Sequence, residues 1–430
     1  MHKLNKVLFV AFHFPPCGVG SGVHRASRFA AYLEEYGWRP YVLTVNDRAH
    51  ERTDNSSGHL NRPNPFTVLR AFALDAQRHL AVRGRYLLIA AVPDRWANWV
   101  LSAVPAGLIG LYREKVDLIL VTFPIATAVL VALILHRLTG KPLVVDFRDS
   151  MTEKGYPPDP RTRAIHQWIE RQVIKHGSRF IFTARSARQM YLDRYPELAH
   201  SSCIVIPNGY DEDDFADIEG RSRTDALEGC IRLVHAGVIY PDDRDPKSFF
   251  RAVHKMRRDG VIDARVLKID LRASGAERYY ASLLRELEID DIVHLLPALP
   301  HRESLKDTAA SDGLLLFQAA SCNHQIPAKV YEYFRLNKPI LALTATAGDT
   351  AMLLNEVGGA TIVDLKDEEA IVRQLAAFLD AVRHGTHSLP DPNRVSVYTR
   401  KNATAALARC LDQLMELRTV QNSALNEPVA

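Results

Sequence analysis

The sequence has few cysteines, and none of them has metal-binding spacing. Its five cysteines are scattered along 430 residues, at Cys17, Cys203, Cys230, Cys322 and Cys410. Because no CxxC pair occurs, neither a zinc site nor a disulfide framework is indicated, and a reducing cytoplasm is the simplest environment. No metal site is predicted.

An apolar run long enough to cross a membrane is also missing. The most apolar stretch, Ile125–Leu135, is well short of the roughly 18 residues that a spanning helix needs, and it predicts a buried helix. The apolar residues Val7–Ala11 are too few for a signal peptide and predict a first strand. We therefore expect a cytoplasmic protein, with peripheral contact to the inner face of the cell membrane left open.

Neither sign of charge dominates the composition. Lys and Arg number 54 and Asp and Glu number 50, a formal net charge of +4. Without a Lys/Arg-rich run this balance gives no support to nucleic-acid binding, but it suits small anionic ligands or an anionic membrane surface. The 47% hydrophobic and 24% charged shares are typical of a soluble globular protein. At this length two domains of roughly 200 residues are expected.

Short apolar runs alternate with helical patterns through both halves, which predicts an α/β protein with parallel sheets. In the first half, strands are predicted at Val7–Ala11, Tyr41–Thr44, Leu118–Val121, Leu143–Val145, Phe180–Phe182 and Cys203–Ile206. Helices are predicted between them at Gly22–Tyr36, Trp96–Arg113, Ile125–Leu138, Thr162–His176 and Ala184–Tyr195. The polar stretch Asp47–Asn64 predicts a long surface loop.

The second half repeats the alternation. Strands are predicted at Ile231–Ala236, Val266–Ile269, Ile292–Leu296, Gly313–Phe317, Pro339–Leu343 and Ala360–Val363. A long amphipathic helix is predicted at Asn393–Met415, followed by a frayed tail. The predicted domains are residues 1–207 and 230–390, joined by a linker at 208–229 and followed by a C-terminal helix and tail at 391–430.

The most informative stretch follows the apolar run that ends at Phe317. A polar loop, Gln318–Gln325, leads into a predicted helix at Ala328–Leu336, with Pro327 in its first turn. In an open parallel sheet, ligands bind beyond the carboxyl ends of the strands, where this loop falls. Lys329 and Glu332 share a helix face, and this pair suits a ligand with a phosphate and sugar hydroxyls. An exposed surface ion pair is the alternative.

Two glycine-containing turns also follow predicted strands. The first contains Gly18, Gly20 and Gly22, and glycine lets the backbone approach an anion at a helix N-terminus. The order is not GxGxxG, so a tight turn is the alternative to a phosphate loop. Arg25 and Arg28 lie on one face of the next helix, facing either an anionic substrate or solvent.

The second turn begins at Gly237 and reaches Arg244 just before a helix. A guanidinium there can bind a phosphate through two hydrogen bonds, unless it pairs with a neighbouring aspartate. A further cluster, Asp146, Arg148 and Asp149, follows a strand of the first half. It predicts either a site or an ion-pair cluster that holds a loop.

Together these stretches resemble glycosyltransferase family 4, whose members have the GT-B fold of two Rossmann-like domains facing across a cleft. The matching pieces are Phe14–Gly20 with Arg25, Asp146–Asp149, Ile206–Asp211, Gly237–Pro246, and Ile326–Tyr333 with Lys338-Pro339. In this order and at this spacing, they are most similar to the branch acting on bacterial envelope and exopolysaccharide sugars.

The resemblance implies roles for the matching positions. The donor nucleotide sugar is expected to contact Gly18, Gly20, Gly237, Arg244, Asn323, Gln325, Ile326, Lys329 and Glu332. Within that set, Arg244 would bind the phosphates and Glu332 the ribose hydroxyls. The candidate catalytic residues are Asp146, Asp149 and His324, and the acceptor side would include Arg25 and Arg148. The C-terminal helix is expected to cross back to the first domain.

The sequence departs from the family pattern at two of these positions. His324 stands where the first of two paired glutamates is usual, and Val238 stands where an arginine is usual after the glycine. The resemblance implies transfer of a sugar from a UDP- or GDP-linked donor to a glycan or lipid-linked acceptor, with retention and without a cofactor. A GT-B epimerase or phosphorylase, and a non-catalytic scaffold, are the alternatives.

Overall fold

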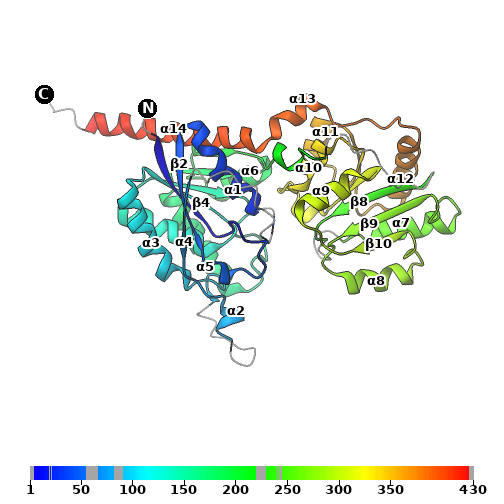
Figure 1. Cartoon of the computed structure of the whole chain (residues 1–430), viewed down its shortest axis with the longest axis horizontal. Coiled ribbons are helices and arrows are strands. Elements are labelled where there is room, and N and C mark those ends of the chain that lie inside the picture. Colours follow the sequence, from blue (N-terminus) through cyan, green and yellow to red (C-terminus); the bar gives the residue numbers. More distant parts are fainter. Residues whose placement is uncertain are drawn as a thin grey trace. The chain divides into compact units, whose positions relative to one another are not determined.

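The computed structural model divides the chain into two compact units. The first contains residues 1–207 and 400–430, and the second contains residues 208–399 (Figure 1). The structure describes residues 4–18, 20, 22–54, 66–81, 91–218, 229–239, 241 and 245–425, with side chains up to residue 420. Each unit is described by itself.

Within its described residues, the first unit is built on a seven-stranded parallel sheet in the order β3-β2-β1-β4-β5-β6-β7. The strands are β1 (Asn5–Ala11), β2 (Trp38–Val45), β3 (Thr67–Ala71), β4 (Leu118–Thr122), β5 (Leu143–Phe147), β6 (Arg179–Phe182) and β7 (Cys203–Val205). The helices are α1 (Gly22–Tyr32), α2 (Ala76–His79), α3 (Trp99–Glu114), α4 (Ala126–Thr139), α5 (Pro160–His176), α6 (Arg185–Arg194) and α14 (Arg400–Leu425).

Both faces of this sheet are covered, as the near-continuous apolar strands require. Alternate strand residues such as Leu8 and Val10 pack against α3, α4, α5 and α6 on one face. Val7 and Phe9 point to the other face, where α1 and α14 complete the core. Local signals define the helix ends: Asp159 accepts a hydrogen bond from the Thr162 N–H and so caps α5, which begins at Pro160.

Within its described residues, the second unit has a six-stranded parallel sheet in the order β10-β9-β8-β11-β12-β13. The strands are β8 (Ile231–Ala236), β9 (Leu267–Arg272), β10 (Val293–Leu296), β11 (Gly313–Gln318), β12 (Ile340–Thr344) and β13 (Ala360–Val363). The helices are α7 (Lys247–Arg258), α8 (Glu277–Glu286), α9 (His301–Ala309), α10 (Lys329–Leu336), α11 (Asp349–Val357), α12 (Glu368–Arg383) and α13 (Pro392–Val395).

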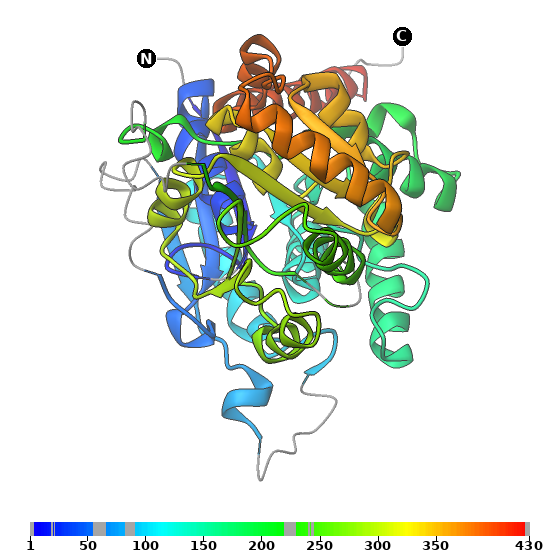
Figure 2. The same ribbon diagram turned by 90° about the vertical axis from the view of Figure 1, so that its right-hand side faces the viewer.

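The second sheet is also covered on both faces. Leu315 and Phe317 pack against α7, α8 and α12, and Figure 2 shows α12 (orange) lying across the strands. Leu314 and Leu316 alternate with them and pack against α10 and α11 on the opposite face. The alternation along β11 therefore explains why the whole run Gly313–Gln318 is buried.

The predicted strands are all present, with ends shifted by a few residues, but two features differ from expectation. The strand β3 was not predicted, because only Ala71 of its five residues is buried. The predicted helix Asn393–Met415 is wrong as a single element. It is interrupted at Thr399, which pairs with Tyr210, and α14 runs on to Leu425, beyond the start of the expected frayed tail.

Candidate functional site

In the second unit, the strand order reverses direction between β8 and β11, the position where open α/β sheets bind ligands. The chain leaves β8 through Gly237, whose φ of 116° is readily adopted only by glycine. The Gly237 N–H donates to the Arg272 carbonyl at 2.9 Å, which fixes this turn against the end of β9. This hydrogen bond therefore fixes the backbone at the carboxyl edge of the sheet, where the parallel strands end.

Lys329 places its ammonium group against this glycine. A Cβ atom on residue 237 would lie 2.9 Å from the Lys329 Nζ, so the ammonium packs where any other residue would have a side chain. The same Nζ lies 2.9 Å from the Nε2 of His235, the residue two places before the glycine. The predicted donor residues Gly237 and Lys329 are thus adjacent.

His235 holds this lysine as a neutral imidazole. It is fully buried, and its Nδ1 lies 2.9 Å from the Leu315 carbonyl oxygen, which can only accept a hydrogen bond. Nδ1 must therefore carry the proton. The Lys329 ammonium can only donate, so Nε2 must carry the lone pair. The contact with His235 therefore positions the ammonium group without adding a negative charge.

The loop after β11 is held by buried side chains. The Gln318 Nε2 donates to the carbonyl oxygens of Cys322 and Gln325, at 2.7 and 2.8 Å. Thr350 donates to the same Gln325 carbonyl at 3.1 Å. The predicted contact residue Gln325 is therefore fixed through its backbone, and His324 and Ile326 lie partly exposed in the same loop.

Asn323 belongs to this loop and is packed against the start of α11. Its carbonyl oxygen accepts from the Asp349 N–H at 3.0 Å, and its side chain occupies the space beside Gly348. Its Oδ1 is buried and has no hydrogen-bond partner among the described residues. An unsatisfied buried oxygen is costly, so this position has an acceptor available for a ligand donor.

Glu332, the predicted ribose-binding residue, lies near a histidine. Its Oε1 is 3.6 Å from the Nε2 of His301, the first residue of α9, and the same nitrogen is 3.7 Å from Asp214. Asp214 is buried, and His301 and Glu332 are partly exposed. The three side chains bring together segments that are far apart in sequence. None of the sequence motifs includes His301.

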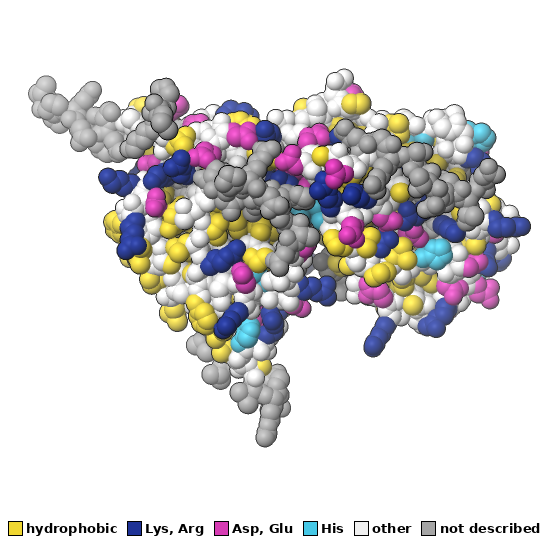
Figure 3. Space-filling view, viewed as in Figure 1, with side chains coloured by type: hydrophobic (Ala, Val, Ile, Leu, Met, Phe, Trp, Pro, Cys, Tyr) yellow, Lys and Arg dark blue, Asp and Glu magenta, His cyan; other side chains and the backbone are white. Residues whose placement is uncertain are grey.

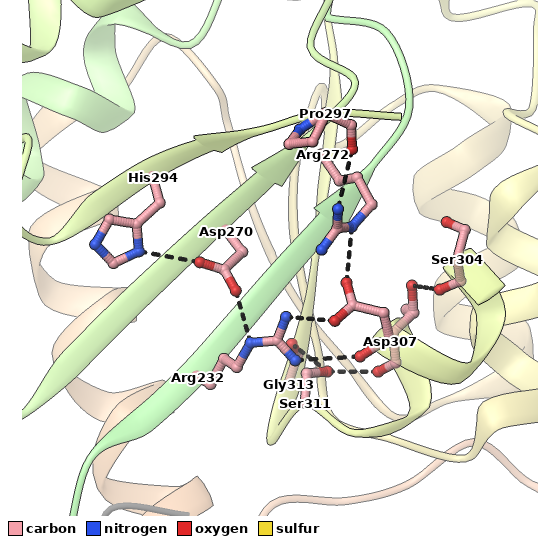
Figure 4. A network of polar contacts seen from close by, with 10 residues as sticks. Arg232, Asp270, Arg272, His294, Pro297, Ser304, Asp307, Ser311 and Gly313 are labelled. Carbon is pink, nitrogen blue, oxygen red and sulfur yellow. Dashed lines mark hydrogen bonds and ion pairs between the residues drawn. The ribbon is translucent and has the colours of Figure 1, made fainter. Parts of the chain in front are cut away.

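A charge network anchors the strands β8 and β9 to α9, which carries His301 (Figure 4). Arg232 donates to Asp270 at 2.6 Å and to Asp307 at 2.8 Å. Arg272 donates to the other Asp307 oxygen at 2.8 Å and to the Pro297 carbonyl at 2.9 Å. Each arginine thus has a carboxylate partner, and the network orients α9.

One histidine extends this network. The Asp270 carboxylate, 3.1 Å from the Nδ1 of His294, raises the pKa of that imidazole. Burial tends to raise the pKa of Asp270, but hydrogen bonds from His294 and Arg232 outweigh it, so the pKa of Asp270 is lowered. Both shifts favour the charged pair.

In the first unit, Arg25 and Asp146 form a buried ion pair. Arg25 donates to both Asp146 oxygens, at 3.0 and 2.9 Å, and each side chain is 1% exposed. Arg25 also donates to the carbonyl oxygens of Ile206 and Pro207, and Thr122 donates to Asp146. These contacts match the alternative of an ion pair that holds a loop. The catalytic role of Asp146 and the acceptor-side role of Arg25 stay predictions.

Arg148 differs from Arg25, although both were predicted on the acceptor side. Its Nε donates to the Phe123 carbonyl at 2.6 Å, and its guanidinium lies against Gly22, where a Cβ atom would overlap it. Burial lowers the pKa of Arg148. Asp149 is exposed at the next position.

The predicted glycines of the first unit have different surroundings. The Gly18 N–H donates to the Arg52 carbonyl at 2.9 Å, and the glycine packs closely against Asp54. Gly20 has a φ of 80° and open space around it. A donor-facing role for either stays a prediction, and Arg244 lies outside the described residues.

Several known proteins resemble this chain. Residues 20–209 match the family model described as "Glycosyl transferase 4-like domain". This match lies almost entirely within the first unit. No curated protein matches the chain.

Solved structures show the fold of the chain: its two Rossmann-like units are those of GT-B proteins. Sucrose-phosphate synthase from Thermosynechococcus elongatus is 12% identical, with a TM-score of 0.64 over 96% of this chain and 100% of that one. Anabaena HepE in complex with UDP and glucose is 14% identical, with a TM-score of 0.59 over 97% and 100%. WaaG, a glycosyltransferase involved in lipopolysaccharide biosynthesis, is 14% identical, with a TM-score of 0.61 over 94% and 99%.

Two features are absent from the described residues. None of the described helices is both long and apolar enough to cross a membrane. Within the same part of the chain, no group of three or more His, Cys, Asp or Glu side chains could hold a metal ion.

Proposed function

We propose that this chain is a glycosyltransferase that transfers a sugar from a nucleoside-diphosphate sugar, UDP- or GDP-linked, to a glycan or lipid-linked acceptor. The observation that supports it most directly is the Lys329 ammonium held by neutral His235 against Gly237. This cation lies at the carboxyl edge of a parallel sheet, where open α/β sheets bind ligands. Anabaena HepE, which has the same fold, was solved with UDP-glucose.

The chemistry needs positive charge where the leaving group departs. The bond between the anomeric carbon and the β-phosphate oxygen breaks, and a bond from that carbon to an acceptor hydroxyl oxygen forms. The hydroxyl proton is released, and the nucleoside diphosphate leaves with the bonding electrons. Lys329 would stabilise this developing charge, and Glu332 would accept hydrogen bonds from the ribose hydroxyls.

Further details belong to the same proposal. Retention at the anomeric carbon is expected, with His324 facing the sugar, and NMR of the product linkage tests it. The Lys329 cation supplies charge stabilisation in place of a metal ion, so activity in EDTA should equal activity in buffer. The product is expected to enter a cell-surface polysaccharide.

Peripheral contact with a membrane is also proposed, on the basis of one apolar helix face. Leu101, Ile109 and Tyr112 of α3 are 80%, 52% and 71% exposed, and they recur at helical spacing. Figure 3 shows hydrophobic side chains gathered over this helix, with Lys and Arg side chains near them. Co-sedimentation with vesicles containing anionic lipids tests this, and the L101E/Y112E variant should stay in the supernatant.

The first experiment is a thermal-shift screen with UDP-, GDP- and dTDP-sugars, because a bound ligand raises the melting temperature by mass action. The stabilising donor is then radiolabelled in the sugar and incubated with lipid-linked glycans. Label in a glycan supports transfer. If no nucleotide sugar shifts the melting temperature, the enzyme lacks the proposed donor and the non-catalytic scaffold is favoured.

An epimerase is the second candidate, because UDP-GlcNAc 2-epimerase from Methanocaldococcus jannaschii has the same fold, with 12% identity and a TM-score of 0.56. An epimerase would change the donor sugar in the absence of any acceptor. A phosphorylase would need inorganic phosphate. NMR of the donor alone, and with phosphate added, separates both from a transferase.

A further inference from the structure

We propose that the first unit carries a second phosphate site, in which the Arg148 guanidinium binds a phosphate group of a substrate. The site lies at the carboxyl edge of the first sheet and is built by residues that follow β1, β4 and β5. Its existence follows from the geometry of these side chains. The nature of its occupant rests on the proposed function.

The position is the point where the strand order of the first sheet reverses. The strands β1 and β4 are neighbours, and the chain runs outward from them in opposite directions. His13 follows β1, Phe123 follows β4 and Arg148 follows β5. Because these strands are neighbours in the sheet, the three residues lie at the same edge. In open α/β sheets this edge binds ligands.

Arg148 is held there by neutral contacts. Its Nε donates to the Phe123 carbonyl, which fixes the plane of the guanidinium. The terminal nitrogens lie against Gly22, the first residue of α1, and a side chain there would displace them. Only a residue without a Cβ allows this close approach, so the glycine and the arginine form one structural unit.

The charge of Arg148 is not neutralised by contact. Among the described residues, no carboxylate lies within ion-pair distance of it, and its two terminal nitrogens have no hydrogen-bond partner. The nearby Asp146 is already bound on both oxygens by Arg25. Arg148 therefore keeps a planar pair of donors that matches two oxygens of a phosphate.

Two histidines line the same region as neutral groups. Burial, with the nearby charge of Arg148 in addition, lowers the pKa of His13 to about 3. Burial lowers the pKa of His50 to about 4, and the Nε2 of His50 is buried without a partner among the described residues. Both rings contact Phe12. Neutral imidazoles can donate hydrogen bonds to an anion that Arg148 binds, and they do not compete with Arg148 for it.

The test measures inorganic pyrophosphate binding to the full chain by calorimetry at low ionic strength. Every protein in this test carries Lys329→Gln, which removes the candidate phosphate-binding lysine of the second unit. R148Q and, separately, G22A should weaken binding roughly tenfold or more, the size of one charge-assisted contact. The matched control R39Q removes an exposed arginine that pairs with Glu34, and it should leave the affinity unchanged.

Gly22→Ala is the decisive variant, because it preserves every charge. Its added methyl group must push the guanidinium aside, and alanine is favourable in a helix, so unfolding does not explain a loss of binding. Melting temperatures of all variants verify this. Pyrophosphate affinity equal to that of the K329Q parent in both R148Q and G22A would overturn the proposal.

Steady-state kinetics in the otherwise wild-type chain identify the source of the phosphate. If the acceptor supplies it, R148Q raises the acceptor KM roughly tenfold and leaves the donor KM unchanged. If the donor diphosphate supplies it, only the donor KM rises. If nucleotide sugars fail to bind the wild-type chain while pyrophosphate binding still depends on Arg148, the donor assignment fails and this site stands.

Discussion

The cations at the two sheets of this molecule differ in which groups hold them. Arg25 and Arg232 are bound by carboxylates, so their charges are compensated within ion pairs of the fold. The Arg148 Nε bonds to a backbone carbonyl, and the Lys329 Nζ to a neutral imidazole, each against a glycine at the carboxyl edge of a sheet. A neutral partner fixes the position of a cation without adding negative charge, and this favours binding of an anionic ligand. The partner, more than the residue type, separates a structural cation from a binding one.

The largest effect is expected from breaking a compensated pair. Replacing Asp146 by Asn leaves Arg25 buried without its counter-charge, which should lower the free energy of unfolding by about 3–5 kcal/mol. Urea denaturation measures this change. Asp193→Asn, on the exposed surface of α6, should change it by less than about 0.5 kcal/mol. A D146N protein as stable as the wild type would show that the pair is not structural.

The next largest effect concerns catalysis. In the proposed function, Lys329→Gln removes the cation that stabilises the leaving diphosphate, so kcat should fall by about 10²–10³, as for loss of one preorganised donor. Stability should change little, because the side chain is partly exposed. The control is Lys366→Gln, which removes an exposed lysine of the same unit. Equal turnover in K329Q and K366Q would contradict the proposed role.

Replacing His235 tests directly whether a neutral partner positions Lys329. His235→Phe keeps the ring contact with Phe317, at 5.1 Å between centroids, but removes both nitrogens. Lys329 then loses its fixed position while the net charge of the site is preserved. Donor affinity should fall roughly tenfold, the value of one hydrogen bond to a charged group. Unchanged donor KM in H235F would show that the lysine is positioned by other groups.

The smallest effect is a pH dependence of the compensated network in the second unit. The raised pKa of His294 means that its contribution is complete below about pH 6.5 and is lost as the pH rises through the raised value. The lowered pKa of Asp270 means that its contribution is present above about pH 4 and is lost on acidification. Because His294 is partly exposed, we expect only a few tenths of a kcal/mol. Urea midpoints across pH measure it, and H294Q should flatten the alkaline slope.

Much of the fold could be predicted from the sequence, because buried parallel strands appear as short apolar runs. The strand β3 was missed because it is mostly exposed, and the break before α14 was missed because Thr399 is fixed by Tyr210, far away in the chain. The helix after Pro327 was predicted one residue early. It begins at Lys329, with Pro327 accepting from the Val330 N–H.

The site was predictable only in part. Spacing placed Lys329 and Glu332 on one helix face, but it did not show that Lys329 contacts His235, 94 positions away. Arg25 and Asp146 were each recognised as candidates, yet their separation by 121 positions concealed that they pair. A histidine two residues before the turn glycine is the only local signal for the lysine contact. Which cations are compensated depends on tertiary contacts, and a single sequence does not show these.

The central claim is most directly tested by calorimetric titration of UDP and GDP into the wild-type, K329Q and K366Q proteins at the same ionic strength. We predict that one of the two nucleotides binds the wild type and K366Q equally, and binds K329Q at least roughly tenfold more weakly. Equal affinity of all three proteins, or no binding by the wild type, would contradict the account.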